Sequence, residues 1–361
     1  MHETGYNKKA ERAILVGCAL GKTRKQEIEY SINELARLID TAGGIEVQRF
    51  IQKRNRPDGA TYIGKGMIEE IKECVEDKEI DLVVFDDQLS PNQMRNISQA
   101  LDVKVIDRPM LILDIFALHA RSHESRLQVD LAQMEYLLPR LTGLWQHFSR
   151  QRGGIGAKGP GETQLEVDRR QVGKKIAILK KKLKKVDKQR QTQRKGRENF
   201  FKIALVGYTN AGKSTLFNRL TRSDVLQEDK LFSTLDSTTR VISVNYPQNI
   251  VITDTVGFIE KLPHQLVASF KSTLEEVNLA DLILLIVDAS DPYKDRKIEV
   301  VRTVLDEIKA SKVPRLIIYN KVDLLGEDDA VPAPDNGHIP ISALKNIGLA
   351  RLKTEILARF G

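Results

Sequence analysis

Residues 203–215 read IALVGYTNAGKST, and this stretch decides the fold of the C-terminal half of the 361-residue chain. Gly207 and Gly212 bracket four residues, and Lys213 and Ser214 follow, which gives the spacing G-x-x-x-x-G-K-S. Apolar residues typical of a buried strand precede the loop, and a helix is expected after it. The glycines let the backbone curl so that successive N–H groups face a phosphate chain at the start of the helix. The stretch therefore predicts a phosphate-binding loop.

The residues of this loop predict how a nucleotide would be bound. Lys213 is expected to bridge the β- and γ-phosphates as a catalytic group, and the Ser214 hydroxyl is expected to complete a Mg²⁺ shell. An accidental glycine-rich turn is the alternative, but the order of strand, loop and helix disfavours it. The predicted nucleotide-binding residues of the loop are Gly207, Tyr208, Thr209, Asn210, Ala211, Gly212, Lys213, Ser214 and Thr215.

A second segment, DTVG, closes an apolar strand about forty residues later. Asp254 is expected to hold Mg²⁺ through a water molecule, and the Gly257 N–H is expected to contact the γ-phosphate, where it counts as a catalytic group. Each of the four residues is predicted to line the nucleotide site: Asp254, Thr255, Val256 and Gly257.

Two further segments select the base. Asp323, the last residue of the segment NKVD, can accept hydrogen bonds from the N1–H and the 2-amino group of guanine. Adenine lacks this pair of donors, so the carboxylate favours GTP over ATP. A segment SAL follows the last expected strand and would bring a backbone N–H near the guanine O6. The predicted base-binding residues are Asn320, Lys321, Val322 and Asp323, together with Ser342, Ala343 and Leu344.

In this order, the four segments resemble those of the P-loop GTPases of the translation-factor-related class. Between them lies LFSTLDSTTR, residues 231–240, a loop expected to order over the γ-phosphate. Its FSTLD portion resembles the first switch of the Obg and HflX-type GTPases, which makes Thr234 the preferred Mg²⁺ ligand beside Ser214, with Thr238 as a competing choice. The residues predicted to contact the nucleotide here are Phe232, Ser233, Thr234, Leu235 and Asp236.

Two residues bear on the rate of hydrolysis. Ras-like enzymes place a glutamine after the glycine of the DTVG-type segment, whereas this chain has Phe258. A phenyl ring cannot orient the attacking water, so slow intrinsic hydrolysis is expected, with stimulation by a partner or an added ion. Asn210 resembles the asparagine with which some GTPases hold K⁺ against the phosphates, and it is predicted to be catalytic in that way. The alternative is that Asn210 only shapes the loop.

The sequence before the loop predicts a separate α/β domain over residues 1–117. Strands are expected near 13–17, 45–52, 82–85 and 103–106, and helices near 27–40 and 66–77, with a third that opens at Ser90. Strands and helices in alternation favour a parallel or mostly parallel sheet. Nothing here has phosphate-loop spacing, although a second nucleotide is left open. The GTPase domain is expected over 199–361, with strands at 202–207, 241–245, 250–254, 282–288, 315–319 and 338–341.

Residues 118–198 predict a helical hairpin. Apolar residues recur every three or four positions from Leu127 to Leu141, and Pro139 should kink or break this first helix. A glycine-rich tip, 150–161, follows. The second helix repeats apolar residues in a heptad-like pattern from Leu165 to Val186. The complete fold expectation is a P-loop GTPase domain with a mostly parallel sheet, preceded by a smaller α/β domain and this hairpin.

The second helix of the hairpin is strongly basic. Residues 169–197 hold 14 lysines and arginines against one acidic residue, so the rest of the chain is mildly acidic although the net charge is +8. A solvated helix usually mixes both signs to form i,i+4 pairs. The imbalance therefore favours a polyanion, and the lack of interleaved aromatic residues favours structured RNA over single-stranded bases. A solvated charged face is the alternative.

One family accounts for all of these segments. Residues 153–170, GGIGAKGPGETQLEVDRR, resemble the signature of the HflX family of ribosome-associated GTPases, and the stretch 62–71 is similar to its N-terminal domain, with Lys65 read as a surface lysine. The resemblance implies GTP hydrolysis with Mg²⁺ and binding to the large ribosomal subunit and its RNA. It also implies a hairpin tip near the peptidyl-transferase region, GTP-dependent separation of stalled or stressed ribosomes, and a monomer when ribosome-bound.

The sequence also gives expectations about an alternative function, a C-terminal domain, and the location of the protein. A regulatory GTPase that docks a protein effector through the hairpin is the alternative function. Some HflX members have a small C-terminal domain, and because this sequence ends at Gly361, functions assigned to that domain are in doubt. Two cysteines cannot form a disulfide framework, and the longest apolar run, 282–287, is too short to span a bilayer. A cytoplasmic protein without a membrane span is therefore expected, with a fraction at the membrane surface as a further expectation.

Overall fold

The structure is a computed structural model. It describes residues 10–21, 23–141, 164–195, 200–221, 231–232, 234–242, 250–262, 271–326 and 338–360. The predicted hairpin tip, 150–161, and Ser233 lie outside these residues. The chain divides into two compact units, of which the first combines residues up to 118 with 130–179 and the second combines 119–129 with 180 onward.

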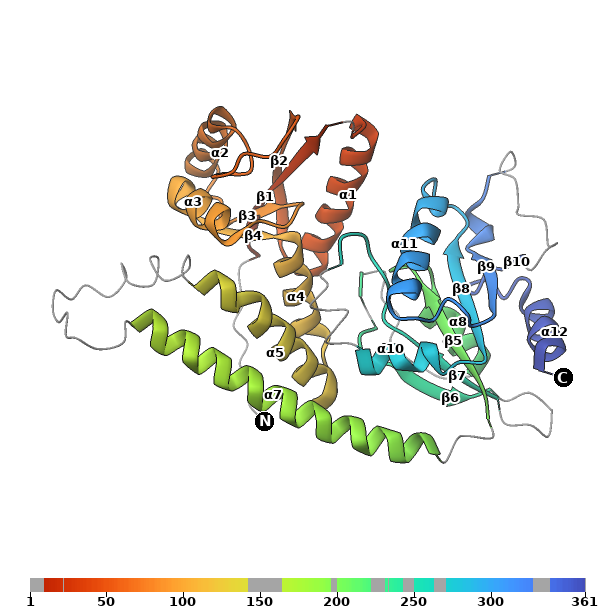
Figure 1. The fold of residues 1–361 in the computed structure, drawn as a ribbon. Coiled ribbons are helices and arrows are strands. Elements are labelled where there is room, and N and C mark those ends of the chain that lie inside the picture. The colour runs from red at the N-terminus through yellow and green to blue at the C-terminus, as the bar shows by residue number, and fades with distance from the viewer. Residues whose placement is uncertain are drawn as a thin grey trace, which may run out of the picture. The chain divides into compact units, whose positions relative to one another are not determined.

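The first unit contains a four-stranded sheet in which every pairing is parallel, in the order β2-β1-β3-β4. The strands are β1 (Arg12–Leu20), β2 (Ile45–Arg54), β3 (Leu82–Phe85) and β4 (Lys104–Asp107). The helices are α1 (Lys25–Thr41), α2 (Lys65–Asp77), α3 (Pro91–Leu101) and α4 (Arg108–His119). Figure 1 shows α1 on one face of the sheet and α2 with α3 on the other. The expected N-terminal α/β fold with a parallel sheet is confirmed.

The local chemistry of α3 follows its sequence closely. Ser90 is the N-cap, and its hydroxyl accepts a hydrogen bond from the Gln93 N–H at 3.3 Å, while the Gln93 side chain accepts one from the Ser90 N–H at 3.0 Å. Proline at the first helical position has no N–H to leave unsatisfied. The inner face of the helix contributes Met94 and Ile97 to a core shared with β1, β3 and α2.

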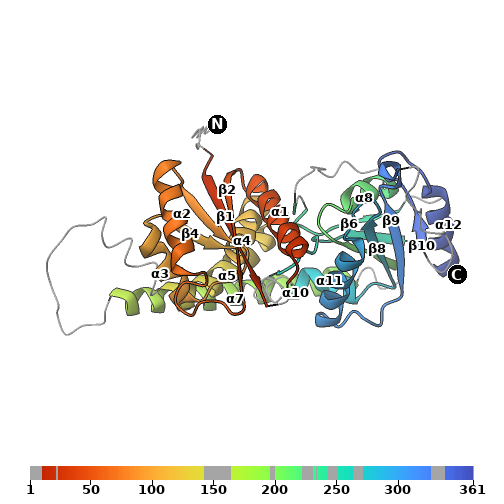
Figure 2. The same ribbon diagram turned by 90° about the horizontal axis from the view of Figure 1, so that it is seen from above.

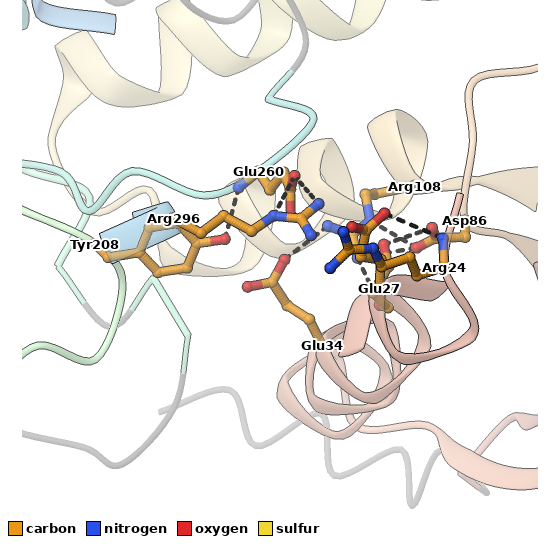
Figure 3. A network of polar contacts seen from close by, with 9 residues as sticks. Arg24, Glu27, Glu34, Asp86, Arg108, Tyr208, Glu260 and Arg296 are labelled. Carbon is orange, nitrogen blue, oxygen red and sulfur yellow. Dashed lines mark hydrogen bonds and ion pairs between the residues drawn. The ribbon is translucent and has the colours of Figure 1, made fainter. Parts of the chain in front are cut away.

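A buried arginine holds the carboxyl end of this sheet together. Arg108 follows β4, is fully buried, and pairs with Asp86 at 2.9 Å and with Glu34 at 2.8 Å (Figure 3). Its guanidinium also donates to the Ser31 carbonyl at 2.8 Å, and Ser31 Oγ donates to Asp86. Such a cluster fixes α1 against β3 and β4, because loss of one member would leave a buried charge uncompensated.

The first hairpin helix, α5 (His123–Leu137), ends where proline was expected to break it. A short 3₁₀ segment containing Pro139 follows at Leu138–Arg140. The Tyr136 hydroxyl donates to Asp107 at the end of β4, and the Arg140 guanidinium lies 3.6 Å from the centre of the Tyr136 ring and donates to the Leu89 carbonyl. The second helix, α7 (Gln164–Lys195), runs alongside α5 in both views (Figures 1 and 2).

The second unit contains a six-stranded sheet in the order β10-β9-β8-β5-β7-β6. The strands are β5 (Phe201–Gly207), β6 (Thr238–Val241), β7 (Ile250–Asp254), β8 (Leu282–Asp288), β9 (Arg315–Asn320) and β10 (His338–Pro340). The helices are α8 (Lys213–Thr221), α10 (Lys271–Asn278), α11 (Lys294–Glu307) and α12 (Leu349–Phe360), with a 3₁₀ turn at Val322–Leu324. The helices α8 and α12 share the apolar core on one face of the sheet. Figure 2 shows α11 on the other face.

One strand was predicted in the wrong place. The expected strand at 241–245 is instead β6, which ends at Val241 and pairs antiparallel with β7 so that Thr238 lies opposite Asp254. Part of the predicted range, residues 243–245, lies outside the described residues. The prediction followed the apolar residues, whereas pairing at this sheet edge uses the β-branched Thr238 and Thr239, which fit a half-buried strand equally well. The remaining pairings of this sheet are parallel.

No helix within the described ranges is both long and apolar enough to cross a lipid bilayer.

Candidate functional site

The phosphate loop leaves the end of β5, and two of its glycines are required by close contacts. A Cβ on Gly207 would lie 2.3 Å from the Ile286 carbonyl oxygen of β8. Gly212 has a φ of +90°, and a Cβ there would lie 2.2 Å from Asn320 Nδ2. Any side chain at either position would push the loop away from its neighbours. The loop is therefore held against β8 and β9, and α8 begins directly after it at Lys213.

Lys213 is buried within the loop. Its ammonium group donates to the Tyr208 carbonyl at 2.8 Å. Burial lowers the pKa of Lys213 to about 8, and the nearby Asp254 carboxylate opposes this shift. A polyphosphate would add several negative charges beside the ammonium, so nucleotide binding would favour its protonated form. The arrangement can hold the charge that develops on a phosphoryl group in transfer.

Three oxygen groups converge beside Lys213. Ser214 Oγ lies 2.7 Å from Thr234 Oγ1 and 2.7 Å from Asp254 Oδ2. Burial raises the pKa of Asp254, whereas Lys213 and the two hydroxyls lower it, and the net direction is upward. Asp254 Oδ1 and Thr209 Oγ1 are buried without a hydrogen-bond partner among the described residues. An orphaned carboxylate oxygen next to two hydroxyls is a donor set that suits Mg²⁺. The competing Thr238 lies in β6 instead.

The DTVG segment packs closely against the phosphate loop. A Cβ on Gly257 would lie 2.9 Å from Lys213 Nζ and 3.0 Å from Thr209 Cα. The Phe258 N–H donates to the Gly207 carbonyl at 3.1 Å, and its own carbonyl accepts from the Thr209 N–H at 2.8 Å. The Phe258 ring is only 1% exposed. Phe258 therefore fastens the segment to the loop with its backbone, and its ring lies in the core.

A second contact fastens the same segment, and two of its members, Glu260 and Arg296, lie outside every sequence motif. The Tyr208 hydroxyl accepts a hydrogen bond from the Glu260 N–H at 2.8 Å (Figure 3). The Glu260 carboxylate pairs with Arg296 of α11 at 2.5 Å, and Lys297 Nζ lies 4.7 Å from the centre of the Tyr208 ring. The sequence reasoning missed Glu260 and Arg296 because they are partners 36 positions apart.

The base-binding segments are joined to the phosphate loop through Asn320. Its buried amide donates to the Ala211 carbonyl at 2.9 Å and accepts from the Ala343 N–H at 2.9 Å. Arg219 of α8, another residue that the sequence reasoning missed, donates to the carbonyls of Ala343 and Leu344 at 3.1 and 3.2 Å. Asp323 lies in the 3₁₀ turn and is half-buried. The structure thus brings NKVD, SAL and the phosphate loop to one edge of the sheet.

Other predicted residues have mainly structural contacts. The Thr255 hydroxyl donates to the Leu205 carbonyl at 2.6 Å. Lys321, with φ of 66°, pairs with Asp288 at 2.7 Å. The side chains of Phe232, Leu235, Val256, Ala211 and Ser342 are buried, those of Thr215 and Val322 are half-buried, and that of Leu344 is exposed. The hydrogen-bond partners of Asp236 lie outside the phosphate loop, at residues 121 and 122.

Comparison with known proteins places this site in a family. The chain matches the family models described as GTP-binding GTPase N-terminal over residues 29–117, GTP-binding GTPase Middle Region over 119–197, and 50S ribosome-binding GTPase over 202–321. It is 50% identical over 344 residues to the GTPase HflX of Caldanaerobacter subterraneus subsp. tengcongensis, covering 95% of this chain and 79% of that protein. The chain belongs to the HflX GTPase family. The HflX of Escherichia coli is 45% identical over 317 residues, which cover 87% of this chain and 75% of that protein.

A solved structure of a GDP complex shares this fold. The crystal structure of the SsGBP and GDP complex is 28% identical, covers 96% of this chain and 98% of its own, and superposes with a TM-score of 0.51. The resemblance to HflX, the α/β fold with a P-loop GTPase domain, and the expected GTPase activity are therefore confirmed. This HflX-family protein binds GTP and hydrolyses it.

Proposed function

We propose that this HflX-family GTPase binds the large ribosomal subunit in its GTP-bound state and separates stalled or stressed ribosomes, and that hydrolysis resets it. One observation carries the proposal, namely the basic face of α7 on the same chain as a GTPase domain. Lys180, Lys181, Lys182, Lys184 and Lys185 are exposed, whereas Leu179 is buried and Leu183 half-buried. The match to a family described as a 50S ribosome-binding GTPase supports this partner.

The chemistry of α7 suggests how the subunit would be recognised. Exposed lysines on one helix can neutralise many backbone phosphates without reading base edges. We therefore assign the ribosomal RNA contact to the basic hairpin, 169–197, and to the glycine-rich tip, 150–161. The proposed domains are 1–117, 118–198 and 199–361, and the ranges of the three family models support them. We further propose that the protein acts in the cytoplasm and binds the ribosome as a monomer.

Within the site, each group receives a proposed role. Ser214 and Thr234 would bind Mg²⁺ directly and Asp254 through a water molecule, and the ion would neutralise charge between the β- and γ-phosphates. Lys213 and the Gly257 N–H would stabilise the γ-phosphoryl group, and Asp323 would select guanine. The convergence of Ser214, Thr234 and the orphaned Asp254 Oδ1 supports the metal position.

The rate of GTP hydrolysis is predicted to depend on K⁺. Asn210 lies in the phosphate loop with a φ of 61°, and its amide oxygen is a suitable ligand for K⁺. We expect GTP turnover in KCl to exceed turnover in NaCl at equal ionic strength by about tenfold or more, because the ion would supply part of the charge stabilisation of an arginine finger. An Asn210→Ala variant should lose the difference. Equal wild-type rates in the two salts would instead leave Asn210 with a loop-shaping role.

Sedimentation of intact ribosomes tests the proposed function directly. The full chain is mixed with ribosomes and either a non-hydrolysable GTP analogue or GDP, then separated on a sucrose gradient. With the analogue, the protein should travel with the large subunit, and the peak of joined ribosomes should fall. With GDP, both effects should be weak. If the analogue produces neither binding nor separation, the proposal is wrong.

A further inference from the structure

Asp236, in the loop 231–240 of the GTPase domain, is bound by the two residues that immediately precede α5, more than a hundred positions earlier in the chain. Asp236 Oδ2 accepts hydrogen bonds from the N–H groups of Arg121 and Ser122 at 3.1 and 3.0 Å. Its other oxygen, Oδ1, accepts from the Ser122 hydroxyl at 2.5 Å. Residues 119–129 and Asp236 belong to the same compact unit.

The chemistry of this contact is that of a helix cap supplied from outside the helix. Ser122 precedes α5; its hydroxyl accepts from the Ser125 N–H at 3.0 Å and its carbonyl accepts from the Arg126 N–H at 3.1 Å. The N–H groups of residues 121 and 122 bond to the Asp236 carboxylate. A carboxylate is favoured here, because the N-terminus of a helix has partial positive charge.

The anchor lies only two residues from the metal position. Thr234 Oγ1 is 2.7 Å from Ser214 Oγ, and Leu235, between Thr234 and Asp236, is 2% exposed. Two residues span at most about 7 Å, so fixing Asp236 severely limits where Thr234 can go. Burial of Leu235 removes most of the remaining conformational freedom of Thr234. The loop is thus held at three consecutive positions, by Ser214, by the core and by α5.

We propose that Asp236 is a positioning residue for GTP hydrolysis, which holds Thr234 at the metal position by capping α5. The contact works in both directions, because any coupling between two sites is reciprocal. A nucleotide that binds Thr234 through Mg²⁺ stabilises the start of α5, and a well-ordered start of α5 favours that nucleotide. The inference rests on the proposed role of Thr234, and it names the part of the hairpin that responds to the γ-phosphate.

The other end of α5 is fastened within the first unit, where Tyr136 donates to Asp107 and Arg140 donates to the Leu89 carbonyl. The glycine-rich tip follows this end in the sequence.

Nucleotide binding by the full chain tests the proposal without ribosomes. Fluorescent GTP analogue and GDP are titrated in Mg²⁺ against wild type, Asp236→Ala and Asp236→Asn. We expect Asp236→Ala to bind the GTP analogue roughly 5- to 50-fold more weakly and to bind GDP within about twofold of wild type, in the usual range of coupling between sites. Asp236→Asn and Ser122→Ala keep part of the cap, so each should show a smaller loss in the same direction.

Amide hydrogen exchange supplies a readout that a merely structural role would not change. In wild type, residues 119–129 should exchange more slowly with the GTP analogue than with GDP, and Asp236→Ala should abolish this difference. Ser90→Ala is the matched control: it removes the cap of α3 in the first unit and costs a similar share of stability, yet should leave the preference for the GTP analogue unchanged.

The outcomes separate this inference from the proposed role of Thr234. If Thr234→Ala loses the preference for the GTP analogue while Asp236→Ala, Asp236→Asn and Ser122→Ala all retain it, the positioning role of Asp236 is wrong. Equal exchange of residues 119–129 with both nucleotides in wild type would also overturn it. If Thr234→Ala itself retains the preference, the metal role of Thr234 fails. Because no ribosome is present, these results do not depend on ribosome binding.

Discussion

Replacing Asp323 by asparagine is expected to weaken GTP binding by roughly 10³-fold or more and to transfer the preference to xanthosine triphosphate. The carboxylate can accept two hydrogen bonds from the N1–H and 2-amino groups of guanine, whereas an amide presents a donor to one of them. A site built to pair with a polar group rejects the wrong partner strongly, because buried polar groups are then left unpaired. Xanthine has a carbonyl where guanine has the amino group, and that carbonyl accepts from the new amide.

The contacts in the structure indicate that a change at Asp323 would alter recognition of the base and leave the phosphate loop in place. Asn320, not Asp323, joins the base-binding segment to the phosphate loop, through its bonds to Ala211 and Ala343. Asp323 can therefore change without releasing the loop. The matched control is Asp288→Asn, which removes a carboxylate paired with Lys321 at 2.7 Å in the same region. It should weaken both nucleotides modestly and leave the preference for GTP intact.

Competition between the two nucleotides gives the measurement. Each protein is loaded with fluorescent GDP, which is displaced with either GTP or xanthosine triphosphate, and the ratio of the two affinities is compared. Wild type and Asp288→Asn should favour GTP, and Asp323→Asn should favour xanthosine triphosphate. An Asp323→Asn protein that still prefers GTP would mean that another group recognises the guanine edge.

Much of the fold could be predicted because the relevant forces are local. Ser90 before a proline starts α3, and α5 ends at Leu137, directly before the 3₁₀ segment that contains Pro139. Gly212 was expected at a sharp turn, and the structure shows the reason in its positive φ and in the position of Asn320. The strand at β6 was misplaced because pairing at a sheet edge depends on the register with β7, which a single segment does not encode.

The parts of the site that escaped prediction join distant segments. Asp236 was expected to contact the nucleotide, yet its hydrogen bonds go to residues 121 and 122. Arg219 and Arg296 are single charged residues on amphipathic helices, where most arginines are solvated. Their roles come from which loop lies beside them, the SAL segment for Arg219 and Glu260 for Arg296. Only folding brings such partners together, so no spacing rule could have found them.

Exchanging five exposed lysines of α7 for glutamate is expected to abolish ribosome binding, with an affinity loss of about 10³-fold or more near physiological salt. The residues are Lys180, Lys181, Lys182, Lys184 and Lys185. Each lysine that neutralises an RNA phosphate releases a bound counterion, so the contacts reinforce one another and depend steeply on salt. Reversal replaces these attractions by repulsion. The measurement is sedimentation with ribosomes and a GTP analogue over a range of salt concentrations.

The helix should survive this change, because all five side chains are exposed and the apolar side of the helix, with Leu179 and Leu183, is untouched. An unchanged rate of GTP turnover without ribosomes and an unchanged circular-dichroism signal of helix would show that the helix is intact.

Exchange of the same lysines for arginine is the matched control, since it keeps the charge and should keep both binding and its steep salt dependence. Ribosome binding that persists after reversal would contradict the RNA contact and favour a protein effector docked on the hairpin. The two hypotheses differ in the class of partner, and only RNA binding requires phosphate neutralisation. A steep salt dependence of ribosome binding by the arginine variant would therefore indicate RNA, even if the glutamate variant still binds partially.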